Sequence, residues 1–490
     1  MDYARIALDA SADRPLYRQL EGAIEAAITA GDLATGERLP SERALAERFG
    51  VSRTTAVNAY RELESRGLVR GQVGRGTYVC APAGAGEGTP FAWSGKLAGA
   101  AQRTTDPGLR TLVRRQPPQT VSFAAGSCAL DLFPTDVFRL LTERVLRRDA
   151  TAALGLGPTE GQPRFRETMA ARYRTRPEKV LALSGSQQGI DLVARCLLDP
   201  GDAVIVDRPG DLGAIQAFRA AGARLVGWDV RRADPEELED LVLRYRPKLL
   251  FTNPSFQNPT GTTMPAETRQ ALLEIAARYK LPLIEDEPYR ELSFGPPPPT
   301  SLRELDDHAL VIQLGTFSKT LAPGLRLGWL IAPSPIVDQL ALVRQRSDVF
   351  PAGLPQLVVA DLVASGAFDA HLKRLRAEHA KRYMKMVAAL RQLVGRRAVE
   401  WSAVEGGLYL WLRLRQGLDA GHLADRALAA GVAVVAGPSF YADGAGRDEV
   451  RLSFGGVPPD AIGIGIERLA GALVEIAGEE PRSAGSLPLV

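Results

Sequence analysis

Two short apolar runs with a polar stretch between them constrain the fold of this chain more than any other feature of the sequence. The runs are Val311 to Leu314 and Leu327 to Ile331. Runs of this kind are typical of strands buried on both faces, as in a parallel sheet covered by helices. The stretch that joins them begins at the end of the first strand and contains Lys319. The pattern therefore predicts an amine at the edge of a buried sheet.

Lys319 has neighbours that suit a phosphorylated aldehyde, with hydroxyls at Thr316 and Ser318 and a guanidinium at Arg326. The lysine would form a Schiff base with the aldehyde, while the hydroxyls and the arginine would hold the phosphate. Lysine is also scarce, because only eight of the 60 Lys and Arg residues are lysines. Since arginine cannot form an imine, a lysine here indicates that the amine itself is needed. A strand-end lysine that reaches solvent is the alternative.

Further apolar runs alternate with helical stretches over most of the chain. Besides the two above, the expected strands are Val180–Leu183, Ala203–Val206, Leu249–Thr252 and Leu283–Glu285. Alternation of strands and helices predicts an α/β fold with a mostly parallel sheet and helices on both faces. In such folds the ligand lies at the carboxyl ends of the strands.

Polar motifs follow several of these strands. Gly185 and Ser186 open a helix after the strand that ends at Leu183, where exposed backbone N–H groups can meet a phosphate. Asn258 could donate a hydrogen bond to a phenolate oxygen, although a Pro-rich turn is the alternative. Asp286 could keep a pyridine nitrogen protonated, and Tyr289 could bond the ring hydroxyl.

The N-terminal part has a different pattern. A helix is predicted over residues 15 to 30, and a short one follows between Ser41 and Gly50. A third helix begins after Ser52. Two short helices joined by a tight turn predict a helix-turn-helix, whose second helix lies in the DNA major groove. Two strands joined by a basic tip predict a wing after it. Residues expected to face bases and phosphates are Arg53, Thr54, Thr55, Asn58 and Arg75.

This arrangement resembles the GntR class of bacterial winged-helix regulators, over residues 14 to 80. The matching motifs are Leu39-Pro40-Ser41-Glu42-Arg43, Val51-Ser52-Arg53-Thr54-Thr55 and Gly74-Arg75-Gly76-Thr77-Tyr78-Val79. The resemblance implies that residues 1–80 bind a double-stranded DNA operator, and it adds Ser41, Arg43 and Ser52 to the expected DNA-binding residues. A helical dimerisation module that touches no DNA is the alternative.

Composition divides the rest of the chain. Residues 81–118 are rich in Ala, Gly, Pro and Thr, which predicts a flexible interdomain linker. Residues 479–490 are predicted to be a disordered tail. No apolar run approaches the ~20 residues of a membrane span and the N-terminus lacks a signal-peptide pattern, so a cytoplasmic protein without membrane contact is expected. The three Cys and four His residues lack metal-binding spacings, and no metal site is predicted.

Residues 119–478 resemble the fold-type I, pyridoxal-phosphate-dependent aminotransferases, through the ordered motifs around Ser186, Asn258, Asp286 and Lys319. The resemblance implies a smaller C-terminal α+β subdomain. It also implies that Lys319 forms the Schiff base with the cofactor and that Asp286 contacts the pyridine nitrogen. It implies ring-oxygen contacts from Asn258 and Tyr289, and phosphate contacts from Gly185, Ser186, Thr316 and Arg326. It also assigns a carboxylate of the substrate or effector to Arg451, in the stretch Glu449-Val450-Arg451-Leu452-Ser453-Phe454.

A GntR-type DNA-binding domain fused to such a domain is similar to the MocR subfamily of bacterial transcription regulators. That resemblance implies that pyridoxal 5'-phosphate, sometimes with an amino compound, acts as an effector, and that the protein is a head-to-tail homodimer. Two positions depart from the pattern. Leu156 stands where a tyrosine usually reaches the phosphate from the neighbouring subunit, and Asp211 stands where an aromatic usually stacks on the pyridine ring.

Three functions are consistent with these residues. The first is a transcription regulator controlled by pyridoxal phosphate. The second is an aminotransferase with an accessory DNA-binding domain, which the spacing Asp286-Glu287-Pro288-Tyr289 favours. The third is a regulator that has lost the cofactor and senses another ligand, as Leu156 and Asp211 suggest.

Overall fold

The computed structural model describes residues 8, 15–30, 32–33, 37–65, 68–72, 76–79, 96–103, 117, 119–394, 399–415 and 417–478. They belong to two compact units, Met1–Gln102 with Pro481–Val490, and Arg103–Glu480. Arg75, most of the expected linker and the expected tail lie outside the described residues. Within residues 96–103 a short helix, α4 (Gly99–Gln102), is present.

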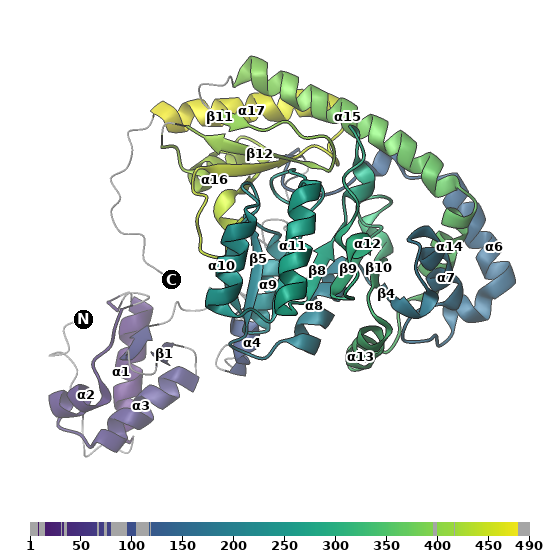
Figure 1. Ribbon diagram of the computed structural model, residues 1–490. Coiled ribbons are helices and arrows are strands. Elements are labelled where there is room, and N and C mark those ends of the chain that lie inside the picture. Colours follow the sequence, from purple (N-terminus) through teal and green to yellow (C-terminus); the bar gives the residue numbers. More distant parts are fainter. Residues whose placement is uncertain are drawn as a thin grey trace. The chain divides into compact units, whose positions relative to one another are not determined.

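Apart from α4, the described residues of the first unit form three helices and a two-stranded antiparallel sheet (Figure 1). The elements are α1 (Leu16–Ala30), α2 (Glu42–Phe49), α3 (Arg53–Ser65), β1 (Val69–Gln72) and β2 (Gly76–Val79). Helix α2 ends at Gly50, whose positive φ of 62° lets its N–H bond the carbonyl of Ala46. The order of helices and strands is the one that the sequence predicts.

The core of this unit comes from the apolar faces that the sequence indicates. Leu20, Ile24 and Ile28 of α1 are buried against a cluster that includes Ala56 and Leu63 of α3. These residues recur at the three- and four-residue spacing of one helix face, so burying them fixes α3 on α1. The opposite face of α3 is left toward solvent.

The second unit is built on a seven-stranded sheet with the order β4-β10-β9-β8-β7-β5-β6. The strands are β4 (Val180–Leu183), β5 (Ala203–Arg208), β6 (Arg224–Asp229), β7 (Leu249–Thr252), β8 (Leu283–Asp286), β9 (Val311–Thr316) and β10 (Gly328–Ile331). All neighbours are parallel except β10, which runs antiparallel to both β4 and β9. The predicted mostly parallel sheet is therefore confirmed.

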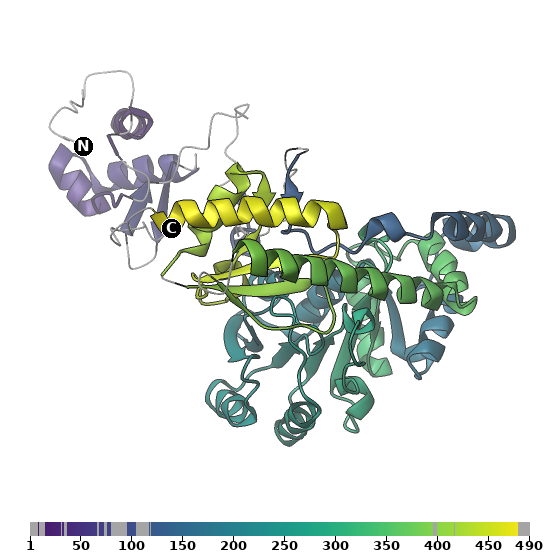
Figure 2. The same ribbon diagram turned by 90° about the horizontal axis from the view of Figure 1, so that it is seen from above.

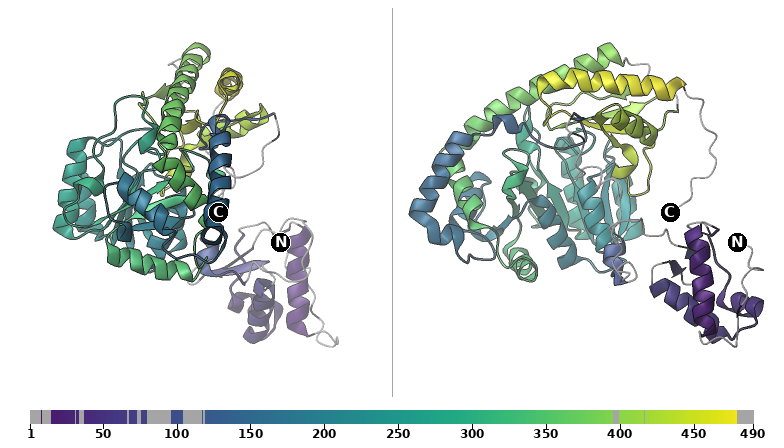
Figure 3. Two further views of the ribbon diagram at one scale, coloured as in Figure 1. Left: turned by 90° about the vertical axis from the view of Figure 1, so that its right-hand side faces the viewer. Right: turned by 180° about the vertical axis from the view of Figure 1, so that it is seen from behind.

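Helices cover both faces of this sheet (Figures 1 and 3). Val204 and Val206 of β5 face a core shared with α8 (Ser186–Leu197), α9 (Leu212–Ala220) and α13 (Ser334–Gln345). Ile205 points the other way, into a core with α10 (Pro235–Tyr245), α11 (Ala266–Tyr279) and α12 (Leu302–Leu305). At the β4 edge the covering helices are α6 (Thr135–Leu154), α7 (Pro163–Arg172) and α14 (Gly353–Ala364). Alternate residues of one strand thus enter opposite cores, which explains the continuous apolar runs.

A second group of described elements in this unit forms the smaller α+β subdomain. Its sheet has the order β11-β12-β15-β14, with β11 (Val399–Trp401), β12 (Tyr409–Leu414), β14 (Val435–Ala436) and β15 (Glu449–Ser453). Figure 2 shows the long helices α15 (Ala367–Leu393) and α17 (Pro459–Gly478) side by side along it. Helix α16 (Ala420–Ala429) completes the core, and β13 (Val432–Ala433) pairs with β3 (Val121–Ser122). Among the described residues, no helix is long and apolar enough to cross a membrane.

Candidate functional sites

The two serines expected at the DNA surface are helix caps. Ser41 Oγ accepts a hydrogen bond from the backbone N–H of Ala44 over 3.2 Å, and Ser52 Oγ accepts one from Thr55 over 3.1 Å. Each hydroxyl satisfies an N–H group at the start of a helix that has no partner within the helix. The serines therefore fix where the two helices begin, and their DNA contact stays a prediction.

The remaining predicted DNA residues lie at the start of α3 and on α2. Arg53 and Thr54 are exposed, while Thr55 and Asn58 are half-buried. Arg53 Nη2 lies 3.5 Å from Glu42 Oε2. Arg43 Nε donates to Glu47 Oε1 over 3.0 Å on the surface of α2. Exposed ion pairs of this kind contribute little to stability, so these arginines can exchange a carboxylate for a phosphate at small cost.

Lys319 lies in the turn that follows β9, as the sequence predicts. Its side chain is half-buried, and Nζ donates a hydrogen bond of 2.6 Å to the carbonyl oxygen of Gly126. Thr316 Oγ1 bonds Ser318 Oγ over 3.0 Å and accepts from the Ser318 N–H over 3.1 Å. Gly126 is a part of the site that sequence reasoning missed, because it lies far away in the chain.

Three of the predicted phosphate residues, Gly185, Ser186 and Arg326, lie at the start of α8. Gly185 precedes this helix with φ of 97°, a conformation that favours glycine. Arg326 Nη2 donates to the carbonyl of Ser184 over 2.7 Å, and a Cβ placed on Gly185 would lie only 3.0 Å from the same Nη2. A guanidinium thus lies at the N-terminus of a helix, where the first N–H groups have no partner within the helix. Both features attract an anion, and Ser186 adds a hydroxyl in the first turn.

Asp286 ends β8 as a buried acid without a partner for one of its oxygens. The residue is 5% exposed, and Oδ1 has no hydrogen-bond partner among the residues that the structure describes. Burial, and next the charge of Asp211, raises the pKa of Asp286 well above its ordinary value, while Lys319 acts in the opposite direction. An unpaired buried carboxyl oxygen is costly, and a protonated pyridine nitrogen would satisfy it. The site therefore fits a pyridoxal ring at this position.

The two residues expected at the ring oxygen have partners in the structure. Asn258 Nδ2 donates to Asp211 Oδ2 over 2.6 Å, which leaves its second N–H for a ligand. The Tyr289 hydroxyl bonds that of Tyr409 over 3.0 Å. Burial and the neighbouring Tyr409 raise the pKa of Tyr289 well above its ordinary value, so its hydroxyl keeps its proton. Tyr409 lies on β12 of the smaller subdomain, and no local motif in the sequence marks it.

Arg451 is a buried cation on β15. The residue is 2% exposed, and Nη2 donates to the carbonyl of Ala124 over 2.6 Å. Nη1 donates to Asn258 Oδ1 over 2.8 Å. The guanidinium carbon lies 4.4 Å from the centroid of the Tyr409 ring and 4.9 Å from that of Phe440. These groups hold the guanidinium without neutralising it, so a carboxylate is a suitable ligand.

The structure also places the two residues that depart from the expected pattern. Leu156, after α6, is 89% exposed. Asp211 lies in the site as the N-cap of α9, where its Oδ1 accepts from the Ala214 N–H over 3.0 Å. Its contact with Asn258 therefore puts an anion beside the expected ring.

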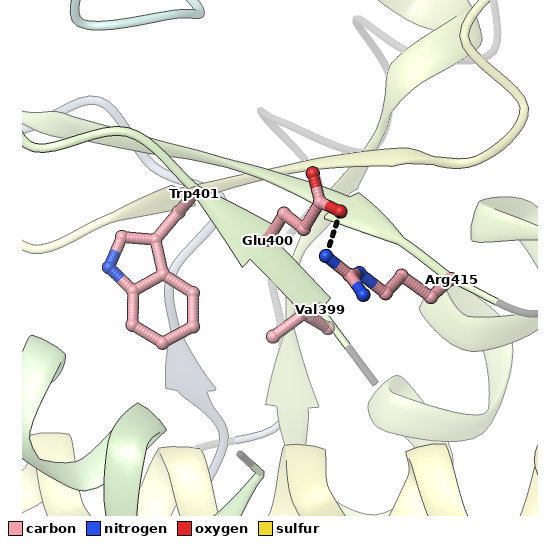
Figure 4. Close-up of a pocket in the computed structure, with 4 residues that line it drawn as sticks. All are labelled: Val399, Glu400, Trp401 and Arg415. Atoms are coloured by element: carbon pink, nitrogen blue, oxygen red, sulfur yellow. Dashed lines mark ion pairs between the residues drawn. The ribbon is translucent and has the colours of Figure 1, made fainter. Parts of the chain in front are cut away.

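Two cavities among the described residues are lined mainly by other parts of the chain. One of about 260 Å³ is lined by Val399, Glu400, Trp401 and Arg415, with Arg415 paired to Glu400 (Figure 4). Another of about 400 Å³ lies between residues 119–127 and 456–461. Neither contains a predicted site residue, so the chemistry of the side chains, and not the size of a hollow, identifies the site.

Together, the two units define a protein class in which a winged helix-turn-helix accompanies a fold-type I aminotransferase domain. Residues 16–79 match the family described as bacterial regulatory proteins, gntR family, and residues 119–469 match aminotransferase class I and II. The chain belongs to the MocR subfamily of GntR-type regulators, as these two domains and its relatives show.

Relatives of both kinds are found. The chain is 32% identical to the probable rhizopine catabolism regulatory protein MocR of Rhizobium meliloti, over 99% of this chain and 98% of that protein. It is 38% identical to a 2-aminoadipate transaminase of Thermus thermophilus, over 78% of this chain and 98% of that protein. A solved structure of LysN, the alpha-aminoadipate aminotransferase of Thermus thermophilus complexed with N-(5'-phosphopyridoxyl)-L-leucine, is 36% identical. Its TM-score is 0.75, and the match covers 79% of this chain and 99% of that one.

Proposed function

We propose that this protein is a DNA-binding transcription regulator whose aminotransferase-like unit binds pyridoxal 5'-phosphate as an effector and thereby changes DNA binding. The single observation that supports cofactor binding most strongly is the orphaned Oδ1 of buried Asp286. A buried acid with an unpaired oxygen suits a protonated ring nitrogen. Lys319 supplies the amine for the aldehyde, and Arg326 supplies a cation for the phosphate.

Each residue has a defined task in this proposal. The amine of Lys319 holds the aldehyde group, and it must give up its hydrogen bond to the carbonyl of Gly126 to do so. Arg326 and the N-terminus of α8 bind the phosphate. Asp286 keeps the ring nitrogen protonated, and Asn258 donates its second N–H to the ring oxygen. When bound, the cofactor would supply an aldehyde that can bond an amino compound and a ring that withdraws electrons.

Regulation requires that the cofactor-binding unit influence the DNA-binding domain. Regulators of this subfamily are expected to act as head-to-tail homodimers on an operator in the cytoplasm, and we assign the same assembly to this chain. Light scattering tests the dimer. The proposal predicts twice the mass of the 52.7 kDa chain, and the mass of a single chain would contradict the homodimer.

The cofactor pocket is tested by the visible absorption of the full-length protein titrated with pyridoxal phosphate. The wild type should gain a visible band at saturating cofactor, and Lys319→Ala should not. Lys373→Ala is the matched control, because Lys373 lies exposed on α15. If neither the wild type nor the control gains the band, the site binds another ligand, as the third interpretation of the sequence holds.

An aminotransferase is the second candidate, because the chain is 38% identical to a 2-aminoadipate transaminase and has a buried arginine suited to a substrate carboxylate. In that function Lys319 would move a proton to and from the substrate carbon, and Arg451 would orient the substrate. Steady conversion of a panel of amino donors with keto acceptors would support it. If protein that shows the visible band gives no turnover, the aminotransferase function is excluded and the regulator function remains.

A further inference from the structure

A buried histidine holds the turn that contains Lys319. His371 lies on α15 and is 1% exposed, and its Nε2 is 2.8 Å from the carbonyl oxygen of Thr320. A carbonyl oxygen can only accept a hydrogen bond, so Nε2 carries the proton of the ring. Because Thr320 directly follows Lys319, this bond fixes the backbone next to the residue that bears the amine.

The bond to Thr320 accounts for a histidine at this position. The other ring nitrogen of His371, Nδ1, has no hydrogen-bond partner among the described residues. Burial lowers the pKa of His371, while the Thr320 carbonyl acts in the opposite direction, so the ring is neutral at neutral pH and has a single N–H. Phe368 and Leu375, on the same face of α15, are buried apolar residues. A leucine would therefore suit the packing and leave no ring nitrogen unpaired, but it could not donate to Thr320.

A buried cysteine holds the same turn. Cys128 is 1% exposed, and its Sγ lies 3.2 Å from the carbonyl oxygen of Leu321 and 3.8 Å from that of Ser318. Burial raises the pKa of Cys128 to about 11, so the thiol keeps the proton that it donates. Carbonyls on both sides of Lys319 thus have side-chain donors from distant parts of the chain.

These backbone bonds differ from the bond that the amine itself makes. Lys319 Nζ donates to the carbonyl of Gly126 over 2.6 Å, and it must leave that oxygen to react with an aldehyde. The donors on His371 and Cys128 hold backbone carbonyls, so they do not compete with an aldehyde for the amine. They can persist when Nζ leaves Gly126, and they then determine where the amine can reach.

We propose that His371 and Cys128 are positioning residues for Lys319, which hold its turn so that the amine meets the aldehyde of the bound cofactor. In the step that they assist, Nζ bonds to the aldehyde carbon, and the two amine hydrogens leave with the aldehyde oxygen as water. Such a step depends steeply on position, since a displacement of about 1 Å can cost about a hundredfold. The inference rests on the proposed function, because it needs a Schiff base at Lys319.

The test compares pyridoxal phosphate with pyridoxamine phosphate in the full-length protein freed of cofactor. Pyridoxamine phosphate has the same ring and phosphate but an amine in place of the aldehyde, so it cannot form a Schiff base with Lys319. His371→Leu should raise the dissociation constant for pyridoxal phosphate, measured by the visible band, by about tenfold. The dissociation constant for pyridoxamine phosphate, measured by calorimetry, should stay within twofold. Equal weakening of both ligands, or no weakening of either, overturns the proposal.

A conservative variant separates the hydrogen bond from the size of the ring. His371→Gln keeps an N–H donor at a similar distance from the backbone, so it should bind pyridoxal phosphate within about threefold of the wild type. If His371→Gln is as weak as His371→Leu, the hydrogen bond is not what positions Lys319, and the proposal is overturned. His422→Leu makes the same chemical change at an exposed position of α16 and is the matched control.

Cys128→Ala tests the second donor independently. It removes a single atom, so the test remains decisive even where His371→Leu does not fold, as circular dichroism would show. A thiol is a weak donor, and this variant should weaken binding of pyridoxal phosphate by about threefold and leave pyridoxamine phosphate unchanged. Unchanged binding of pyridoxal phosphate would overturn the role of Cys128.

The inference and the proposed function fail in different ways. If the wild type gains no visible band with pyridoxal phosphate, the proposed function is contradicted, whatever the variants do. If the wild type gains the band and the variants of His371 and Cys128 bind pyridoxal phosphate equally well, only the positioning role is contradicted.

Discussion

Replacing Asp286 by asparagine tests the assignment of the ring-nitrogen site. Asp286 Oδ1 has no partner among the described residues and the residue is 5% exposed, so little water can replace a lost ligand contact. A hydrogen bond to a charged group contributes about 1.5–3 kcal/mol, and each 1.4 kcal/mol is a factor of about ten in affinity. Asp286→Asn keeps the shape but is neutral, so it cannot form an ion pair with a protonated nitrogen. The dissociation constant for pyridoxal phosphate should rise roughly ten- to hundredfold.

The assay is an absorption titration with pyridoxal phosphate at constant pH. Asp191→Asn makes the same chemical change on the surface of α8, in an exposed ion pair with Arg195, and serves as the control. Circular dichroism verifies that Asp286→Asn is folded. A dissociation constant within twofold of that of the wild type would refute the role of Asp286.

Three other predictions concern stability. Burial raises the pKa of Asp207 from 3.8 to about 7, so the native state retains a proton that the unfolded chain releases. The free energy of unfolding should therefore fall as the pH rises between these values, by up to about 1.4 kcal/mol per pH unit. Asp207→Asn should reduce this slope, measured by urea titrations at several pH values. An unchanged slope would contradict the raised pKa of Asp207. Arg269 is fully buried, 3.9 Å from Glu285 and 3.6 Å from Glu287. Arg269→Met should cost about 3–5 kcal/mol, because it removes the ion pair of buried Glu285 and leaves Glu287 with Arg290 alone, and an unchanged urea midpoint would argue against this network. Ser52→Ala should destabilise the N-terminal unit by about 1 kcal/mol, measured by thermal unfolding, and no loss would mean that the cap is dispensable.

Much of the fold follows from local patterns in the sequence. The apolar run before Lys319 is continuous because β9 is buried on both faces, and all six of its residues are buried. Ser41 and Gly50 mark the ends of α2 because a cap hydroxyl and a left-handed residue are local requirements of a helix. Strand β6, Arg224–Asp229, was not predicted, because it lies at the edge of the sheet. Its residues alternate between buried and half-exposed positions, so they form no continuous apolar run.

The contacts of the site were harder to predict, because they join distant parts of the chain. Lys319 bonds Gly126, and Tyr289 bonds Tyr409. These pairs are 193 and 120 residues apart, and only the docking of the smaller subdomain brings them together. The sequence identified Asp211 as a departure from the expected pattern. Its bond to Asn258 depends on how the ends of β5 and β7 lie next to each other in the sheet.

The most direct test of the account is operator binding by the full-length protein, measured with and without saturating pyridoxal phosphate. A DNA fragment selected from a random pool by the protein itself provides the probe. The cofactor should change the affinity or the footprint of the wild type and of Lys373→Ala, and it should have no effect on Lys319→Ala. Sequence-specific DNA binding that is identical with and without the cofactor, in protein that shows the visible band, would contradict the central claim.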